Sequence, residues 1–237
     1  MCSMKLLPVF VAALDVAACS IQQHPLTSNA AASLRGRRVA TTARPPTPFF
    51  VTEPDKNYAS MFALSGAIGI AVSKSDAGTR ILRENGIANP DPYMAQQLSN
   101  DLQRRYGLQL ERQAVYITDD DPKQIVAAHP EADLLLDAWI NNLSLLPFSH
   151  NPSKYQVRYT AYLRLIDAKI VDHIDEKKGR VIAHGKCNRF LAETPSAPTY
   201  DELLANGAQR LKDTLAAAAQ SCVDEFRSKV LTESPNP

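Results

Sequence analysis

The sequence lacks several features that would point to particular classes of protein. It has one tryptophan, four cysteines and nearly balanced charge, with 26 Lys and Arg against 25 Asp and Glu in 237 residues. Without an excess of positive charge, we do not expect binding to nucleic acid. The apolar run near the N-terminus, residues 6–14, is also too short for a membrane-spanning helix, which needs about 20 residues.

Short catalytic motifs are missing as well. The chain has no His-Glu-x-x-His, Cys-x-x-Cys, Gly-x-Ser-x-Gly or Ser-x-x-Lys sequence. No histidine has a second ligand at the spacing of a metal site; the five are His24, His129, His150, His173 and His184. We therefore predict a protein that is not an enzyme and has no metal and no cofactor. An acid/base pair assembled only in space would leave no such trace.

The N-terminus has the features of an export signal that ends at a lipid-attachment site. Lys5 supplies a positive charge ahead of the apolar run, and residues 16–19 read Val-Ala-Ala-Cys. These residues resemble the lipobox of bacterial lipoproteins, in which cleavage precedes the cysteine and the thiol is acylated. The resemblance implies a signal peptide at 1–18 and lipidation, including palmitate, at Cys19. The alternative is a buried N-terminal helix with a chance cysteine.

The same resemblance predicts where the protein works. Ser20 follows the cysteine, and in bacterial lipoproteins this favours forwarding to the outer membrane. Several acyl chains hold a protein firmly, whereas a single chain binds a membrane only marginally. The expected location is the cell envelope, anchored by lipid to the outer membrane and facing the periplasm.

Two cysteines remain beyond the signal and the anchor, Cys187 and Cys222. In an oxidising compartment, two thiols favour a disulfide. Cys187 falls on the apolar face of a predicted strand, and Cys222 falls on the apolar stripe of a predicted helix. We expect them to be bonded, and two separate buried thiols are the alternative.

Composition divides the exported chain into three parts. Residues 19–36 are rich in Ser, Ala, Asn and Gln, and we interpret them as a flexible tether that would span about 20–25 Å. Residues 37–231 are predicted to form a single α+β periplasmic domain, which begins with a strand over 37–43. Residues 232–237 are predicted to be a disordered tail.

Residues 57–73 form an unusual segment because none of them is charged. One interpretation is a core or interface helix that continues to Asn85 and is capped by Gly86. The other is a segment for self-association or for dipping into a membrane, because small residues permit close helix contact.

The middle of the domain carries clear local signals. Asp91 is expected to be the N-cap of a helix with Pro92 at its first position, closed by Gly107. Residues 108–118 then predict a strand. The acidic run 119–121 could suggest calcium, but it lacks the spacing of an EF-hand loop, so we expect it to cap a short helix over 122–128.

The remaining elements predict an antiparallel meander covered by a helix. Strands are expected over 134–145, 155–167 and 181–190, joined by turn-rich links. Val181, Ala183, Gly185 and Cys187 are expected to share one face. A capping box at Thr199 then opens a long helix whose apolar stripe runs to Leu231, over roughly 48 Å; its members are Leu204, Ala208, Leu211, Leu215, Ala218, Cys222, Phe226 and Val230.

This order of elements over residues 90–230 resembles that of envelope lipoproteins such as the activators of penicillin-binding proteins and the curli-secretion lipoprotein. The segments that carry the resemblance are 132–136, 165–168 and 179–182, with a charged insertion at 169–178. It implies a non-enzymatic protein that binds or assembles with an envelope partner, or with itself. A second hypothesis is an amphiphile-binding or transporter-auxiliary lipoprotein that uses residues 57–73.

Overall fold

The computed structural model describes residues 23–54, 68–171, 178–190 and 196–232. The predicted signal peptide, Cys19 and most of the uncharged segment lie outside these residues. The strands are β1 (Arg38–Ala43), β2 (Phe49–Val51), β3 (Gln109–Leu110), β4 (Val115–Tyr116), β5 (Leu134–Phe148), β6 (Asn151–Val171) and β7 (Lys178–Phe190). The helices are α1 (Ser28–Ala32), α3 (Ile68–Glu84), α4 (Asp91–Tyr106), α5 (Pro122–Ala128) and α6 (Tyr200–Lys229).

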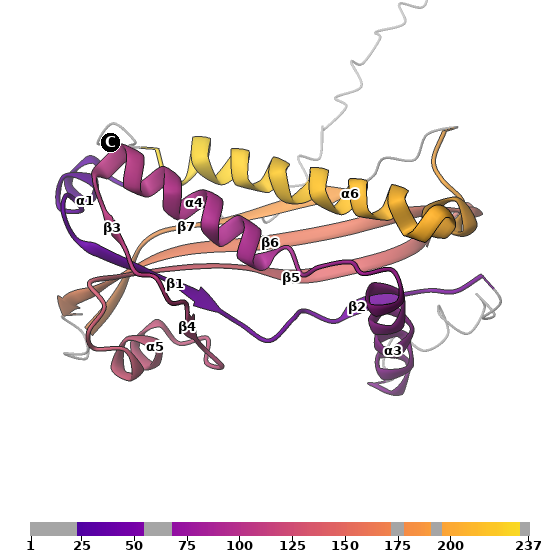
Figure 1. Ribbon diagram of the computed structural model, residues 1–237, viewed down its shortest axis with the longest axis horizontal. Coiled ribbons are helices and arrows are strands. Elements are labelled where there is room, and N and C mark those ends of the chain that lie inside the picture. Colours follow the sequence, from indigo (N-terminus) through magenta and orange to yellow (C-terminus); the bar gives the residue numbers. More distant parts are fainter. Residues whose placement is uncertain (1–22, 55–67, 172–177, 191–195, 233–237) are drawn as a thin grey trace, which may run out of the picture.

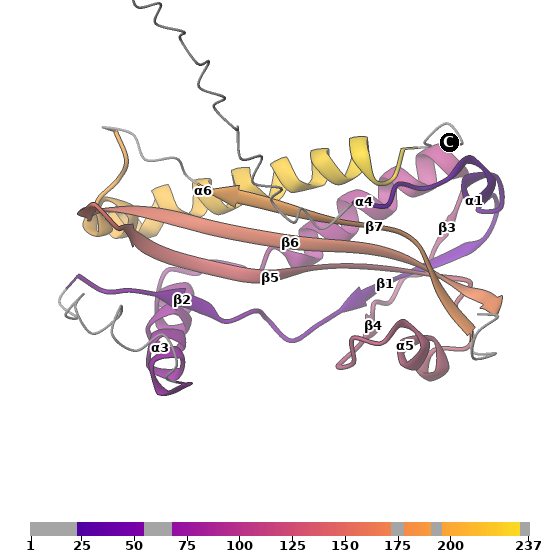
Figure 2. The ribbon, with the colours of Figure 1, turned by 180° about the vertical axis from the view of Figure 1, so that it is seen from behind.

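The strands form one sheet with helices on both sides. Its main order is β3-β1-β5-β6-β7, while β2 pairs with β5 and β4 pairs with β1. Helices α4 and α6 lie side by side along one face, and α5 and α3 lie at opposite ends of the other (Figure 1). The view from behind shows β7 at the margin of the sheet (Figure 2). The predicted α+β class, with a meander covered by a C-terminal helix, is confirmed.

The meander follows the predicted alternation along β6. Its odd-numbered residues from Tyr155 to Leu165 are buried against α4 and α6. In β7 the alternation holds for Ala183 and Cys187, but it is wrong for Val181. The pairing shifts between Leu165 and Ile166, and this bulge turns Val181 toward a second, smaller core beside α5.

The parallel strands were not visible in the sequence pattern. Strand β5 pairs in parallel with both β1 and β2, and β1 pairs in parallel with β3 and β4. The single strand predicted over 108–118 is wrong, because only 109–110 and 115–116 pair with β1. The intervening residues 111–114 are polar or small and exposed, so a bend there leaves little apolar surface uncovered.

Helix α6 begins as predicted but is not one continuous rod. The side chain of Thr199 accepts from the backbone N–H of Glu202, and the side chain of Glu202 accepts from that of Thr199. Asn206, Gly207 and Ala208 then adopt positive φ and interrupt the helix. Asn and Gly visit this conformation more readily than other residues. The predicted unbroken length of roughly 48 Å is therefore wrong.

Glycine allows two close approaches between elements. A Cβ on Gly185 of β7 would meet the Cγ2 of Val230 at 2.5 Å, so α6 lies close to the sheet there. A Cβ on Gly78 of α3 would overlap the backbone carbonyl of Phe49 in β2. Helix α3 ends at Glu84, shortly before Gly86 with a φ of +61°, near the predicted end. Among the described residues, no helix has the length and apolarity required to cross a membrane.

The N-terminal segment belongs to the folded body from residue 23 onwards, which corrects its interpretation as a tether. Residues 28–32 form α1, with Thr27 as N-cap. Leu26 and Leu34 are completely buried, and the N–H of Leu26 donates to the carbonyl of Val230 at 2.8 Å. The prediction was based on polar composition, but two leucines are enough to dock the segment because they fill the core between α6 and the sheet.

Candidate functional site

The described part of the chain begins at the margin formed by β7, and we call this place the entry point. His24 and His184 exchange two backbone hydrogen bonds of 2.9 Å each. Their rings stack with centroids 5.6 Å apart. Burial, together with the neighbouring His24, holds the pKa of His184 below its ordinary value. The side chain of Gln23 donates to Glu225 at 2.9 Å, so the entry point is fixed to both β7 and α6.

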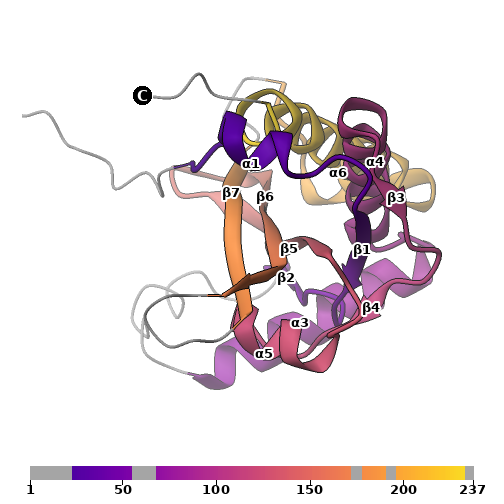
Figure 3. The same cartoon turned by 90° about the vertical axis from the view of Figure 1, so that its left-hand side faces the viewer.

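A disulfide lies beneath this entry point. Cys187 and Cys222 are bonded, with their Cα atoms 5.5 Å apart and both residues completely buried. This is the pairing expected from the sequence, and it joins β7 to α6. Figure 3 shows α1, α6 and β7 gathered on the same side of the molecule. The bond therefore locks together the two elements that hold the N-terminal segment.

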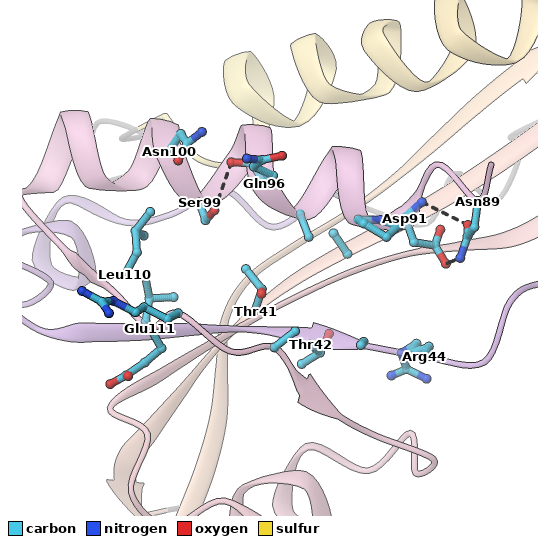
Figure 4. A pocket seen from close by; sticks show the side chains of 17 residues that line it. Thr41, Thr42, Arg44, Asn89, Asp91, Gln96, Ser99, Asn100, Leu110 and Glu111 are labelled. Carbon is cyan, nitrogen blue, oxygen red and sulfur yellow. Dashed lines mark hydrogen bonds between the residues drawn. The ribbon is translucent and has the colours of Figure 1, made fainter.

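A cleft lies between β1 and α4, toward the margin of the sheet that is opposite β7 (Figure 4). Its volume is about 320 Å³. Thr42 and Arg44 approach it from the β1 side, and Asn89, Asp91 and Gln96 approach it from the α4 side. Its lining is mixed and for the larger part apolar, with a few charged and hydrogen-bonding groups that could orient a small molecule.

Asp91 joins the start of α4 to the sheet, which differs from its predicted role as N-cap. Pro90 takes the N-cap position and provides no side-chain hydrogen bond. A carboxylate oxygen of Asp91 instead accepts from the backbone N–H of Ile140 at 2.8 Å, and the residue is 8% exposed. Burial raises the pKa of Asp91 above its ordinary value, against the opposing effect of the hydrogen bond from Ile140.

A second carboxylate, that of Asp137 in β5, is completely buried and surrounded by donors. It accepts from Thr42 at 2.6 Å, from Arg44 at 3.0 and 2.8 Å, and from Arg164 at 2.6 Å. Burial alone would raise the pKa of Asp137. The hydrogen bond from Arg44 and the charge of Arg164 outweigh burial, so the pKa lies below its ordinary value. Asp137 is therefore held as an anion.

The acidic run before α5 is divided between two tasks. Asp121 accepts from the N–H of Lys123 at 3.0 Å and caps α5, as predicted. Asp120 pairs with Arg44 at 2.6 Å, and its carbonyl accepts from Arg164 at 2.6 Å. Within the described ranges, no group of three acidic, histidine or cysteine side chains could hold a metal ion. The run thus extends the cluster centred on Asp137.

Aromatic rings and cations alternate beside this cluster, on the sheet face opposite α4 and α6. Trp139 stacks on Tyr162 with ring centroids 5.3 Å apart. The guanidinium groups of Arg44 and Arg164 lie 4.4 and 5.1 Å from the centroid of the Trp139 ring. Lys186 lies 5.5 Å from the centroid of Tyr162. These contacts continue the ionic cluster from β5 to β7.

Two apolar grooves follow α6. One, of about 430 Å³, lies between α6 and the ends of β6 and β7 and includes Phe190. The other, of about 550 Å³, lies between α6 and the loop before α4 and includes Tyr93. Ala217 lines both grooves. With one groove on each of its sides, this part of α6 is shaped to receive another chain or an apolar molecule.

The sequence interpretation missed the cluster around Asp137. A signal was present, because Asp137 is the only charged residue in the otherwise apolar stretch 134–140. An acid at such a position needs buried partners. Its partners Thr42, Arg44 and Arg164 are 27 to 95 positions away in sequence, so neither spacing nor period could identify them.

No family model and no curated protein matches the sequence. The solved structures with a similar chain path include the hypothetical protein CT253 from Chlamydia trachomatis, 12% identical, with 82% of this chain and 97% of that chain covered and a TM-score of 0.39. PelC from Paraburkholderia phytofirmans, solved as a dodecamer, is 11% identical over 84% and 91% of the two chains, with a TM-score of 0.32. Lipoprotein GNA1162 from Neisseria meningitidis is 11% identical over 80% and 99%, with a TM-score of 0.25. Likenesses of this degree assign no activity or partner.

Proposed function

We propose that this chain is a non-enzymatic cell-envelope protein, anchored to the outer membrane through acylated Cys19, whose periplasmic domain binds or assembles with an envelope partner. The observation that carries the proposal is the buried disulfide between Cys187 and Cys222, combined with the lipobox-like residues 16–19 just before the folded body. Structural disulfides persist in oxidising compartments outside the cytosol. Both features favour the same compartment.

The arrangement of the charged groups favours a structural role for them. Asp137 is occupied by donors from Thr42, Arg44 and Arg164. Asp91 is occupied by the backbone of Ile140. General acid/base catalysis needs a titrating group within reach of a substrate, whereas these carboxylates serve to fix β1, α4 and β5 to one another.

The grooves beside α6 support a binding role. They are predominantly apolar, they flank the exposed Ala217, and Tyr93 at one of them is 39% exposed. Apolar surface that stays exposed beside a rigid helix is typical of sites for protein partners. The helix beneath the grooves is fixed by the disulfide, so binding there would order few additional groups.

Two experiments test the proposal. Cells expressing the chain are labelled with radioactive palmitate, and we expect label on the wild type and none on Cys19→Ser. An unlabelled wild-type chain that stays in the cytosol contradicts the anchor.

Crosslinked pulldown from intact cells then tests binding. Ala217→Glu should lose the crosslinked partner, whereas Ala127→Glu, on an exposed position of α5, should retain it. Equal recovery by both variants contradicts binding at the grooves.

A further inference from the structure

The entry point of the chain determines how near the folded body lies to a bilayer, if Cys19 carries the proposed anchor. Gln23 is held by Glu225, and His24 is held by His184. Only four peptide steps separate Cys19 from Gln23, and four residues reach about 14 Å at full extension. The β7 margin would therefore lie within about 14 Å of the acylated residue. A flexible tether over 19–36 would allow the folded body to stand farther from the membrane.

One surface lies directly beside this entry point. It is the face of β6 and β7 that is turned away from α6, and we call it the attachment face. His184, at the entry point, and Phe190, at the end of β7, are six residues apart, or about 20 Å along the strand. The attachment face consists of four cross-strand pairs: Arg164 with His184, Tyr162 with Lys186, Thr160 with Asn188 and Arg158 with Phe190.

The side chains of the attachment face suit the boundary between water and lipid. Phe190 is 58% exposed, and the Arg158 guanidinium lies 6.0 Å from the centroid of its ring. Lys186 lies over Tyr162 in the same way. In the part of the chain that the structure describes, no carboxylate forms an ion pair with Arg158 or Lys186. Aromatic rings and long cationic side chains together are typical of membrane interfaces, where the cations reach the phosphates.

We propose that the attachment face rests on the headgroup region of a phospholipid bilayer, with Phe190 at the boundary and with Arg158 and Lys186 on lipid phosphates. The inference rests on the proposed anchor, because the short connection from Cys19 is what brings this face to the membrane. This orientation occupies Phe190 at one of the two grooves beside α6 and leaves the other, which includes Tyr93, accessible to a partner.

The test uses the chain from Cys19 onwards, which contains every described residue. Because Cys187 and Cys222 are bonded, the Cys19 thiol can be coupled alone to maleimide lipid in vesicles of phosphatidylethanolamine and phosphatidylglycerol. A Trp139→Phe background removes the only tryptophan. Phe190→Trp then reports on the attachment face. The matched control is Tyr116→Trp, because Tyr116 is 61% exposed and lies on β4, which pairs with β1 rather than with β7.

Vesicles whose acyl chains are brominated near the glycerol should quench the tryptophan at position 190. We expect the Phe190→Trp protein to lose roughly half its emission, since interfacial side chains lie about 5–10 Å into the headgroup and acyl boundary. The Tyr116→Trp protein should keep its emission. Adding Arg158→Glu and Lys186→Glu should restore most of the emission at position 190. Equal quenching at positions 190 and 116, quenching at neither, or quenching that survives the charge reversal overturns the proposal.

The result is independent of cellular acylation, because chemical coupling replaces it. A negative result here leaves the Cys19 anchor intact and removes only the orientation. An absence of palmitate on the chain in cells removes the proposed anchor, while the coupled protein still reports which face lies on lipid.

Discussion

Replacing Asp137 by asparagine should destabilise the fold strongly while preserving its shape. The side chain is completely buried and accepts hydrogen bonds from Arg44 and Arg164, whose side chains are 12% and 13% exposed. Asp137→Asn leaves two poorly hydrated guanidinium groups without their shared anion. Breaking a buried ion pair by removing one partner costs about 3–5 kcal/mol. The retained hydrogen bond from Thr42 places the expected loss near the lower end, at about 3 kcal/mol.

The control is Asp120→Asn, which changes a carboxylate paired with the same Arg44 at 2.6 Å but is 83% exposed. An exposed ion pair contributes about 0–1 kcal/mol. Urea unfolding is followed by circular dichroism and by the emission of Trp139, which lies beneath both arginines. An unfolding free energy of Asp137→Asn within about 1 kcal/mol of the wild-type value would contradict the structural role of this carboxylate, and so would an equal loss in Asp120→Asn.

The pH dependence provides a second readout of the same variant. The folded pKa of Asp137 lies below its ordinary value, so the stabilisation is complete above the unfolded pKa of about 3.9 and is lost as the pH falls through the folded pKa. The difference in unfolding free energy between the wild type and Asp137→Asn should therefore be constant near neutral pH and shrink below about pH 4. A difference that grows on acidification contradicts the assigned cause.

Three further predictions address the entry margin. Removing the disulfide with Cys187→Ala and Cys222→Ala should lower the unfolding free energy by about 4 kcal/mol in the chain-entropy model, given the separation of 35 residues; no change in urea midpoint contradicts this. Leu26→Ala should lower the unfolding free energy by about 2–5 kcal/mol because it leaves a cavity. Asn29 is exposed, so Asn29→Ala should change the unfolding free energy little, and equal effects of the two substitutions would support the flexible tether instead. The depressed pKa of His184 means that the unfolded chain takes up more protons below about pH 6.5, so stability should fall from about pH 7 to pH 5. His184→Phe should reduce that fall. If denaturant titrations give the same slope of unfolding free energy against pH in this variant as in the wild type, His184 is not the cause.

The places where sequence interpretation failed share a physical origin. Asp91 and Pro92 have the composition of a helix start, but the carboxylate of Asp91 is used by Ile140, 49 positions away. The polar composition of 19–36 suggested a tether, but Leu26 docks on Val230. The predicted alternation in β7 holds from Ala183 onwards, but a bulge before Ala183 turns Val181 to the opposite face. In each case a distant contact outweighed a local preference.

The sequence by itself determined the elements whose signals lie within a few residues. These are the capping box of α6, the Asp121 cap of α5 and the alternating burial of β6, because capping and side-chain period act between near neighbours. Only the tertiary structure decided that β1 pairs in parallel with β5, and that Arg44 meets Asp137 across 93 positions. Such contacts depend on how the elements pack in three dimensions. Residues that are far apart in sequence leave no local pattern from which their contact could be predicted.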